Sequence, residues 1–398
     1  MNVLVGITGS IAAYKTAEVV SQLAKQQVPV RVMMTEKSCE FVTPLTFATL
    51  SRQAVFTDRD FWQAQHGRPL HISLGEWADV ILIAPLSAHT LAKLSLGLAD
   101  NLLLNVVLAS NCPVLLAPAM NTIMWSQPIV QEHLARLKER ERFVIIPPAT
   151  GILACDTIGT GKMAAPQTIL DYLMSVRHTK GKQDLLGKRI LVTAGGTREY
   201  LDAVRFIGNP ATGKQGVAIA KAALHRGAEV SLIYANPVET VPECKTIVVS
   251  SALELEQVLQ AEFPHHDWLI MAAAVSDVKP QTCVNYKLAK AELPDCLPLV
   301  PVPDLIATIS QNKRPAQKVI GLAAQTGTDA EMIAKGREKL LTKQLDGILI
   351  NAIDRPTGGF ARAENEGIFL DCHGRQKVYP LVSKLEIGHL LLDDIKNL

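Results

Sequence analysis

The same order of strand, glycine turn and helix opens each half of the 398-residue chain. Near the N-terminus, residues 3–8 form an apolar run with β-character, Gly9-Ser10 marks a turn, and residues 11–25 have helical spacing. In the second half, residues 189–193 are strand-like and precede a turn at 194–196. Runs that are apolar along both faces are typical of parallel strands buried between two helical layers. The repeat therefore favours a fold in which helices cover both sides of each sheet.

Further strand candidates correspond between the halves. The run 28–34 corresponds to 228–234, and the run 77–85 corresponds to 266–274. Strands that alternate with helical stretches predict βαβ units and a parallel sheet. We therefore expect an α/β protein made of two doubly wound, mostly parallel-sheet domains of the Rossmann type.

A polar, glycine-flanked segment at 177–187, RHTKGKQDLLG, separates the two halves, and no apolar periodicity crosses it. We expect a first domain over 1–180, a linker over 181–187 and a second domain over 188–398. The end of the second domain differs from the end of the first, because a hairpin pattern there precedes a last helix over 383–396.

Charge and cysteine content limit the classes of partner. Forty Lys and Arg residues nearly balance 38 Asp and Glu residues, which gives no electrostatic footprint for nucleic acid or an anionic membrane. The seven cysteines include no CxxC pair, and their scatter suits a reducing compartment. The N-terminus carries no targeting pattern, and no run of about 18 apolar residues is uninterrupted. We expect a cytoplasmic protein that acts on small molecules.

The turn after the first strand is the first candidate binding site, because ligands of open parallel sheets lie beyond the carboxyl ends of the strands. It reads Gly6-x-x-Gly9-x-x-Ala12, and the second strand ends in Met33-Met34-Thr35 without the acid that binds a ribose hydroxyl. This pattern argues against NAD and FAD and is compatible with a mononucleotide. Hydroxyl side chains near the strand ends either bind its phosphate or only cap helices: Thr8, Ser10, Thr35, Ser38, Ser87 and Thr90.

In the second half, residues 208–215 nearly match the phosphate-binding pattern GxxxxGK[ST]. The match fails at Gln215, which has no hydroxyl for Mg²⁺. Gly213 and Gly216 still free backbone N–H groups that can hold an anion, and a plain loop is the alternative.

Three side chains of the first half carry possible chemistry. His71 is expected just before a strand, Cys155 in a long loop between Pro147 and Pro166, and Asn121 at the end of a buried strand. Taken singly, each also fits a structural role, because turns favour Asn and a loop thiol is often a spectator.

Taken together, the motifs of the first half resemble the flavin-containing cysteine decarboxylases, a family with a flavodoxin-like fold. They are TGSIAAYK (8–15), PLHISLGEWADVILIAP (69–85), ADNLL (99–103), LAPAMN (116–121) and CDTIGTGKM (155–163). The second half resembles phosphopantothenoylcysteine synthetase in TAGGTRE (193–199), the Asn209 and Gly213-Lys214 segment, AAAVSD (272–277) and GLAAQT (321–326). In this order the two halves resemble the bifunctional bacterial coenzyme A enzymes, in which phosphopantothenate–cysteine ligase is fused to phosphopantothenoylcysteine decarboxylase.

The first resemblance implies FMN-dependent decarboxylation of 4′-phosphopantothenoylcysteine to 4′-phosphopantetheine, because oxidation of the thiol carbon creates the electron sink that loss of CO₂ needs. It implies that His71 is the base, that Asn121 binds the substrate carboxylate and that Cys155 lies on a flap that assists the final reduction. The implied FMN-binding residues are Gly9, Ser10, Ile11, Thr35, Ser38, Ser87, Thr90 and Ala119.

The second resemblance implies that CTP and Mg²⁺ activate the carboxylate of 4′-phosphopantothenate as an acyl-cytidylate, which cysteine then attacks. Asn209 would stabilise that acyl-nucleotide, and Lys339 and Lys343 share one face of a predicted helix. Which residues would hold the Mg²⁺ is unknown at this stage. The implied CTP and substrate residues are Ala211, Thr212, Gly213, Gly216, Met271, Ala272, Ala273, Asp277, Lys287, Pro303, Asp304, Leu305, Ile306, Leu322, Lys339 and Lys343.

Several alternatives stay open at this stage. Ala211-Thr212 replaces the usual serine pair and Leu322 the usual Phe, so CTP versus ATP is undecided and a decarboxylase with an impaired ligase is a second hypothesis. A non-catalytic flavin-binding regulatory subunit is a third, which His71, Asn121 and Cys155 together disfavour. The resemblance also implies a homo-oligomer with trimeric decarboxylase and dimeric ligase contacts, as in a dodecamer.

Overall fold

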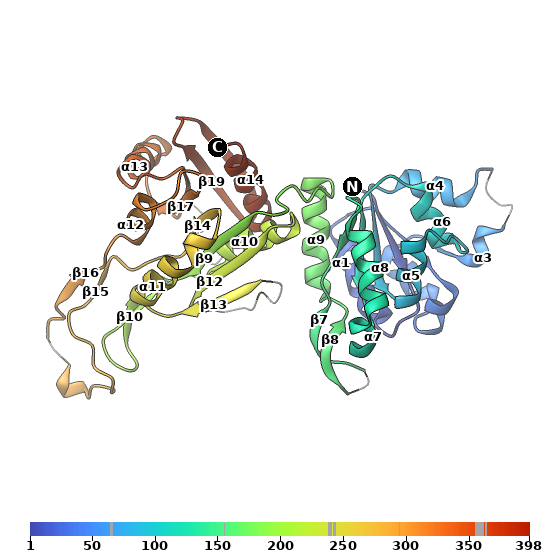
Figure 1. Ribbon diagram of the computed structural model, residues 1–398, viewed down its shortest axis with the longest axis horizontal. Helices are drawn as coiled ribbons and strands as arrows, with labels where there is room; N and C mark the ends of the chain where they lie inside the picture. The colour runs from blue at the N-terminus through green and yellow to red at the C-terminus, as the bar shows by residue number, and fades with distance from the viewer. Residues whose placement is uncertain are drawn as a thin grey trace. The chain divides into compact units, whose positions relative to one another are not determined.

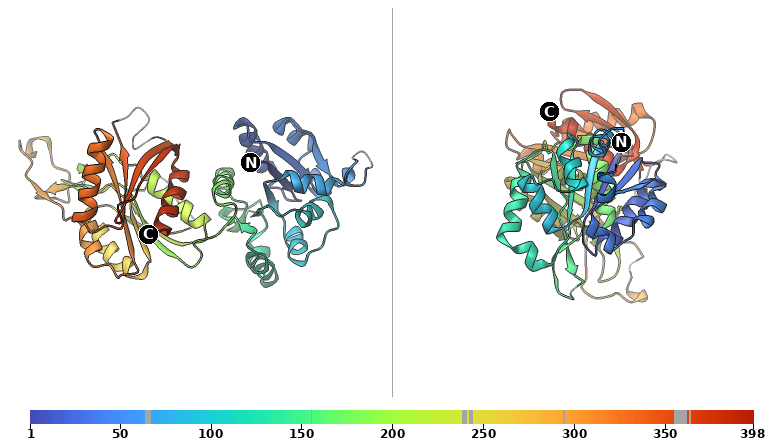
Figure 2. Two further views of the ribbon diagram at one scale, coloured as in Figure 1. Left: turned by 90° about the horizontal axis from the view of Figure 1, so that it is seen from above. Right: turned by 90° about the vertical axis from the view of Figure 1, so that its right-hand side faces the viewer.

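The computed structural model describes the chain except residues 64–66, 155, 238–240, 242–243, 294, 355–361 and 363. Its internal contacts divide the chain into two compact units, Met1–Lys182 and Gln183–Leu398. Each unit is a twisted sheet between helices (Figures 1 and 2). The expected α/β architecture with two doubly wound sheets is therefore confirmed.

The N-terminal unit contains a six-stranded parallel sheet in the order β3-β2-β1-β4-β5-β6. Without the three-residue edge strand β3, this is the flavodoxin-like order. The predicted runs 3–8, 28–34 and 77–85 correspond to β1, β2 and β4. The strands are β1 (Val3–Ile7), β2 (Val30–Met34), β3 (Val55–Thr57), β4 (Val80–Leu86), β5 (Val114–Pro118) and β6 (Phe143–Ile145).

Helices cover both faces of this sheet because neighbouring strand residues point to opposite sides. Val3 and Val5 pack with α1, α2 and α9, and Leu4 packs on the other face with α4, α5, α6 and α8. The helices are α1 (Ala13–Lys25), α2 (Pro44–Ser51), α3 (Asp58–Phe61), α4 (Leu70–Trp77), α5 (Ala88–Leu96), α6 (Leu102–Ala109), α7 (Thr122–Ser126), α8 (Pro128–Lys138) and α9 (Pro166–Thr179), with a 3₁₀ turn η1 (Glu36–Glu40).

Two local expectations for this unit were wrong. His71 lies inside α4, several residues before β4 begins at Val80, because the short apolar segment after Pro69 forms a helix. The stretch expected as a long loop around Cys155 contains an antiparallel hairpin, β7 (Ala149–Ile152) with β8 (Ile158–Lys162). Cys155 itself lies outside the described residues.

The C-terminal unit contains an eight-stranded sheet in the order β13-β12-β9-β14-β17-β18-β19-β20. Its first six strands are parallel, and the last two form the predicted antiparallel hairpin. Two short ribbons, β10 with β11 and β15 with β16, lie outside this sheet. The strands are β9 (Arg189–Gly195), β10 (Arg198–Tyr200), β11 (Phe206–Gly208), β12 (Glu229–Ala235), β13 (Lys245–Val249), β14 (Trp268–Met271), β15 (Val278–Pro280), β16 (Leu299–Pro301), β17 (Lys318–Gln325), β18 (Gly347–Ala352), β19 (Glu364–Asp371) and β20 (Gln376–Ser383).

Helices of the C-terminal unit again form two layers. Ile190 and Val192 of β9 pack with α10 and α14, and Leu191 packs with α11, α12 and α13. The last helix begins and ends within one residue of its predicted range. The helices are α10 (Lys214–His225), α11 (Ala252–Glu262), α12 (Leu305–Gln311), α13 (Asp329–Thr342) and α14 (Lys384–Lys396), with 3₁₀ turns η2 (Phe263–His265) and η3 (Lys290–Glu292).

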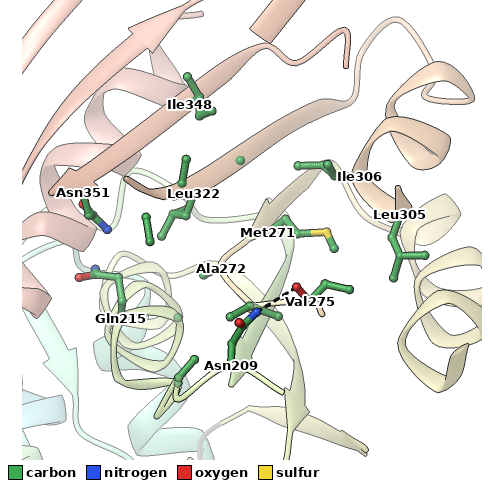
Figure 3. A pocket seen from close by; sticks show the side chains of 18 of the residues that line it. Asn209, Gln215, Met271, Ala272, Val275, Leu305, Ile306, Leu322, Ile348 and Asn351 are labelled. Carbon is green, nitrogen blue, oxygen red and sulfur yellow. Dashed lines mark hydrogen bonds between the residues drawn. The ribbon is translucent and has the colours of Figure 1, made fainter. Parts of the chain in front are cut away.

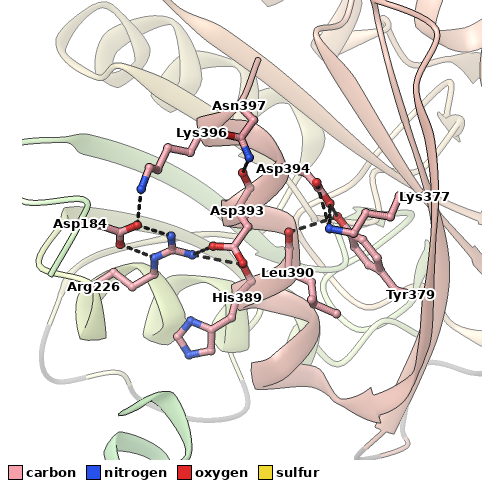
Figure 4. A network of polar contacts seen from close by, with 10 residues as sticks. All are labelled: Asp184, Arg226, Lys377, Tyr379, His389, Leu390, Asp393, Asp394, Lys396 and Asn397. Carbon is pink, nitrogen blue, oxygen red and sulfur yellow. Dashed lines mark hydrogen bonds and ion pairs between the residues drawn. The ribbon is translucent and has the colours of Figure 1, made fainter. Parts of the chain in front are cut away.

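A buried arginine ties the start of this unit to its last helix (Figure 4). Arg226 is 2% exposed and donates two hydrogen bonds to Asp184, at 2.8 and 2.7 Å. It also pairs with Asp393 of α14 at 2.8 Å, and Lys396 donates to Asp184 at 2.5 Å. Burial opposes ionisation of Asp184, but the hydrogen bonds from Arg226 and Lys396 hold the pKa of its carboxyl well below the ordinary value. With Leu185 buried in the core, these pairs integrate residues 183–187 into the C-terminal unit.

We predict that Arg226→Met destabilises the C-terminal unit by about 3 kcal/mol, because it leaves two carboxylates without their buried partner. Hydrogen exchange read by mass spectrometry should show faster exchange in residues 183–187 and α14, with the N-terminal unit unchanged. Lys377→Met, which removes an ion pair of a half-exposed lysine with Asp394, is the matched control. Unchanged exchange in α14 of Arg226→Met would contradict the account.

Candidate active site

The C-terminal unit holds a cavity of about 770 Å³ (Figure 3). It is lined by the carboxyl end of β14 and by residues of β17 and β18, next to the point between β9 and β14 where the strand order reverses. This is the position at which open α/β sheets bind ligands. Four segments supply most of its wall, namely residues 209–216, 271–277, 302–306 and 321–324.

Two glycines shape the loop that leads into α10. Gly213 has a φ of +77°, and a Cβ there would come 2.5 Å from the ring of Tyr234, whose hydroxyl donates to the carbonyl of Thr212. A Cβ on Gly216 would come 2.6 Å from the carbonyl oxygen of Thr193 in β9. The loop and the first turn of α10 can therefore sit this close to the sheet only with glycine at both positions.

The side chain of Gln215 takes a structural role in place of the hydroxyl of the phosphate-binding pattern. Its amide donates to the carbonyl of Lys384 at 3.3 Å and accepts from Asn365 at 3.3 Å. Gln215 thus links the first turn of α10 to β19 and to the first residue of α14.

The opposite wall is built around the segment that follows β14. Asn209 donates to the carbonyl of Val275 at 3.1 Å, and the N–H of Ala273 donates to the hydroxyl of Thr193 at 3.0 Å. The carboxylate of Asp304 caps α12 by accepting from Ala307. It also forms an ion pair with Lys343 at 2.8 Å. This pair joins the start of α12 to the residue that follows α13, at the edge of the cavity.

The cavity brings together all but one of the residues predicted for CTP and its substrate. The exception is Lys287, which is exposed in the segment between β15 and β16 and is not among the lining residues. The predicted residues that line the cavity are Asn209, Ala211, Thr212, Gly213, Gly216, Met271, Ala272, Ala273, Asp277, Pro303, Asp304, Leu305, Ile306, Leu322, Lys339 and Lys343.

Six polar lining residues are absent from the predicted site: Lys214, Gln215, Ser276, Asn351, Asn365 and Lys384. The Gly213-Lys214 and AAAVSD motifs were usable signals for the first three. The last three come from β18, β19 and α14, far along the chain, and only the folded sheet places them at the cavity. Asn351 has a buried side-chain oxygen without a hydrogen-bond partner among the described residues.

In the N-terminal unit, polar side chains gather at the carboxyl ends of β1 and β4. The hydroxyl of Thr8 donates to the carbonyl of Pro85 at 2.7 Å and accepts from the N–H of Ser87 at 2.9 Å. Ser87 caps α5 by accepting from Thr90, and Ser10 accepts from Ala12 in the turn before α1. These residues lie at the point where the strand order reverses, which is the place at which such sheets bind the phosphate of a mononucleotide.

The other predicted FMN residues occupy two different environments. Gly9 and Ile11 belong to the same turn, where Ile11 is exposed. Thr35 and Ala119 are buried next to β2 and β5. Ser38 is fully buried, and its hydroxyl donates to the carbonyl of Thr35 at 2.7 Å, so that donor is already used within the chain.

The hairpin β7–β8 packs closely on the segment that contains Asn121. The N–H of Met120 donates to the carbonyl of Gly161 at 2.9 Å, and a Cβ on Gly161 would come 2.4 Å from the carbonyl oxygen of Met120. A Cβ on Gly159 would overlap Thr122 at 2.3 Å. Asn121 caps α7 by accepting from Ile123 at 2.8 Å. The two glycines therefore let the hairpin lie directly over the Asn121 turn.

His71 lies in the first turn of α4 and packs against Phe61. Its ring meets the edge of Phe61 at 5.5 Å between ring centres, and its Nδ1 is buried without a hydrogen-bond partner in the described part of the chain. Among the described residues there is no group of three or more His, Cys, Asp or Glu side chains that could hold a metal ion. No helix in the described ranges has the length and apolar character needed to span a membrane.

Comparison with known proteins finds matches over the whole chain. Residues 1–178 match the family described as Flavoprotein, and residues 185–398 match the family described as DNA/pantothenate metabolism flavoprotein C-terminal domain. The coenzyme A biosynthesis bifunctional protein CoaBC of Bacillus subtilis (strain 168) is 35% identical over 399 residues, which cover 100% of this chain and 97% of that protein. Proteins of the same name from Escherichia coli (strain K12) and Mycobacterium tuberculosis (strain ATCC 25618 / H37Rv) are 38% and 37% identical, each covering 99% of this chain and 96% of the relative.

Two doubly wound units, one of flavoprotein type and one with a ligand cavity at its switch point, define a two-domain flavoprotein. Within that class, the chain belongs to the family of bifunctional coenzyme A biosynthesis proteins, as the resemblance of its motifs implied.

We predict that Gly213→Ala lowers stability more than Gly374→Ala, although both glycines have positive φ. A left-handed alanine costs about 1–2 kcal/mol in either variant. In Gly213→Ala the new methyl group also overlaps the ring of Tyr234, which adds about 1–3 kcal/mol to the loss of stability. At Gly374 no atom lies within 4 Å of the Cβ position, so that variant has no such overlap. Urea unfolding measures both costs, and equal losses in the two variants would show that the loop is not held against Tyr234.

Proposed function

We propose that this chain catalyses two consecutive steps of coenzyme A biosynthesis. The C-terminal unit joins 4′-phosphopantothenate to cysteine at the expense of CTP, and the N-terminal unit decarboxylates the product to 4′-phosphopantetheine. The observation that carries the proposal is the single cavity that collects the predicted nucleotide residues from separate segments of the chain. The full-length match to relatives named as bifunctional coenzyme A biosynthesis proteins supports it.

In the ligation, a carboxylate oxygen of 4′-phosphopantothenate forms a bond to the α-phosphorus of CTP. The α–β bridging oxygen leaves with its electron pair on pyrophosphate. The amine of cysteine then attacks the acyl carbon, CMP leaves, and the amine loses a proton. Negative charge accumulates on the phosphates, so donors at fixed positions lower the barrier. The loop amides at Gly213 and Gly216 and the ammonium groups of Lys339 and Lys343 supply such donors, and Asn209 holds the acyl-nucleotide.

Magnesium fits this site as an ion held mainly by the substrate. Mg²⁺ usually keeps several waters and binds through one or two carboxylates together with substrate phosphates. The described residues offer no cluster of three ligands, and the exposed carboxylate of Asp277 lies on the cavity wall. We therefore propose Asp277 as the protein ligand of a magnesium ion that enters with the nucleotide.

For the decarboxylation, the turn at Gly9, Ser10 and Ile11 with the hydroxyls of Ser87 and Thr90 would hold FMN at the carboxyl ends of β1 and β4. When bound, FMN supplies the two-electron oxidation and reduction that makes loss of CO₂ from a cysteine derivative possible. His71 accepts the proton that the substrate loses, and the amide of Asn121 holds the substrate carboxylate. The hairpin β7–β8 lies over Asn121, so it can exclude water from the site.

A second copy of the chain is part of this proposal. The resemblance of the motifs to the bifunctional enzymes implies an assembly of several chains. We propose a homo-oligomer in which neighbouring N-terminal units complete each decarboxylase site. The trimeric and dimeric contacts implied by the resemblance remain predictions.

Mass spectrometry of the products tests the function. Purified chain is incubated with 4′-phosphopantothenate, cysteine and Mg²⁺, with CTP or ATP in parallel. We expect 4′-phosphopantetheine with CTP, and the ATP reaction decides the nucleotide preference. Accumulation of 4′-phosphopantothenoylcysteine would show that the chain has the ligase activity and lacks the decarboxylase activity. Conversion of added 4′-phosphopantothenoylcysteine without ligation would establish the impaired-ligase alternative, and no conversion in any reaction would contradict both activities.

Two single substitutions should separate the activities. Asn209→Ala should slow ligation by roughly 10²–10³-fold, because a donor to the reacting group is lost. The same variant should convert supplied 4′-phosphopantothenoylcysteine at the wild-type rate. His71→Asn should show the reverse pattern, with decarboxylation slowed by roughly 10²–10⁴-fold. The proposal fails if either substitution affects both reactions equally in a folded chain.

A further inference from the structure

The ribbon formed by β15 and β16 ends in an open loop. Within the ribbon, Pro280 stands opposite Leu299. One step further, the N–H of Gln281 donates to the carbonyl of Pro298 at 2.9 Å, which continues the same register. Beyond this hydrogen bond, no backbone hydrogen bond joins the two arms among the described residues, and the chain opens into a loop that contains η3 (Figure 1). Further pairs can therefore extend the ladder without a change of register.

Each arm of this loop carries an exposed thiol, and the register relates the two. Two residues beyond Gln281 and Pro298 lie Cys283 and Cys296, both exposed, and neither forms a disulfide. Continuation of the register places these cysteines opposite each other, with their side chains on the same face. Opposite residues of a hydrogen-bonded antiparallel pair lie about 5.5 Å apart between Cα atoms, which is a common Cα spacing of disulfides. Closure of two more pairs of the ladder therefore brings the thiols into bonding geometry.

The rest of the unit holds the two arms unequally. In the first arm, the N–H of Val284 donates to the carbonyl of Leu201 at 3.2 Å. The N–H of Leu288 donates to the carboxylate of Asp202 at 3.3 Å. For residues 295–297 of the second arm, the described contacts include no hydrogen bond to another element. The arm with Cys283 is thus anchored, and the arm with Cys296 can approach it.

We propose that Cys283 and Cys296 are a reversible oxidation site, and that their disulfide closes the loop and slows the activation step of the ligation. Lys287, which is predicted to bind the nucleotide or substrate, lies inside this loop, exposed and outside the cavity lining. Its segment must change position to reach a substrate, and a disulfide between the arms restricts that change. The effect on ligation rests on the function proposed above, whereas formation of the disulfide does not.

The reaction is thiol–disulfide exchange with a small-molecule disulfide. The thiolate of one cysteine attacks a sulfur of that disulfide, its S–S bond breaks, and one half leaves as a thiolate with the electron pair. The second cysteine then attacks the protein sulfur of the mixed disulfide, and the other half leaves as a thiolate. The two protein thiols lose their protons and are oxidised, and the small disulfide is reduced to two thiols. Excess thiol reverses both steps.

The acceptor of the proposed ligation belongs to the same redox couple. Cysteine is a thiol that reduces such a bond, and its disulfide, cystine, is an oxidant that forms it. The site can therefore report whether the acceptor is present in the reduced form. Within a reducing compartment, disulfides of this kind are transient and are typical of redox sensing.

Peptide mapping of the full chain tests the modification. The reduced chain is treated with cystine, the remaining thiols are blocked with N-ethylmaleimide, and tryptic peptides are read by mass spectrometry without reduction. We expect a peptide that links Cys283 to Cys296 and disappears after treatment with dithiothreitol. Cystine-treated chains in which these cysteines are blocked or separately cysteinylated, without the linkage, would overturn the proposal.

Pyrophosphate release from CTP and 4′-phosphopantothenate tests the effect on ligation, because this step needs no thiol. In the linked chain, release in a single turnover should slow by roughly 10- to 100-fold, the range expected when a positioning group is misplaced. Dithiothreitol should restore the rate. Cys296→Ser should be insensitive to cystine, whereas Cys372→Ser, which removes another exposed cysteine, should respond like wild type.

The outcomes separate this inference from the function beneath it. Unchanged pyrophosphate release from the linked wild type would overturn the effect on ligation, and so would an equal response of Cys296→Ser. A reduced wild type that releases no pyrophosphate with both substrates present would contradict the proposed function itself. The peptide map would still decide in that case whether the disulfide forms.

Discussion

The close packing of glycine backbones against the C-terminal sheet is the constraint on which the ligand cavity depends. Gly216 allows the first turn of α10 to approach the carbonyl of Thr193, and Gly388 allows α14 to approach α10. Without either close approach, the two helices could not start at the same edge of the sheet. Because they do, the N–H groups of the loop and the lysines at both helix starts converge on one volume. The backbone N–H groups and the lysine side chains therefore both place positive charge at the cavity.

In the N-terminal unit, the predicted FMN-binding residues lie at the corresponding edge of the sheet, beyond the carboxyl ends of β1 and β4. The hydroxyl of Thr8, at the end of β1, donates to the carbonyl of Pro85 and accepts from the N–H of Ser87, so the ends of β1 and β4 are joined at this edge. The hairpin β7–β8 covers Asn121 through contacts that only glycine permits at 159 and 161.

Much of this arrangement could be predicted from the sequence because the buried strands are long apolar runs. Strands β1, β4 and β12 were recognisable from such runs, and α14 from its helical spacing. The hairpin β7–β8 could not be recognised, since its strands are short, rich in glycine and stabilised mainly by packing on the Asn121 segment. His71 was misplaced because the apolar segment of α4 is too short to distinguish a helix from the approach to a strand. Lys384 carries no local signal, because its burial results from α14 returning to α10.

The fate of the carboxylate oxygen tests the central claim, activation of the substrate as an acyl-nucleotide in the C-terminal cavity. The chain would be given 4′-phosphopantothenate labelled with ¹⁸O in both carboxylate oxygens, together with CTP, cysteine and Mg²⁺. Mass spectrometry then locates the label. The account predicts one ¹⁸O in CMP and one in the amide of the product, because the attacking oxygen stays on the α-phosphorus when cysteine displaces the nucleotide. Label in inorganic phosphate or pyrophosphate, with unlabelled CMP, would contradict the account.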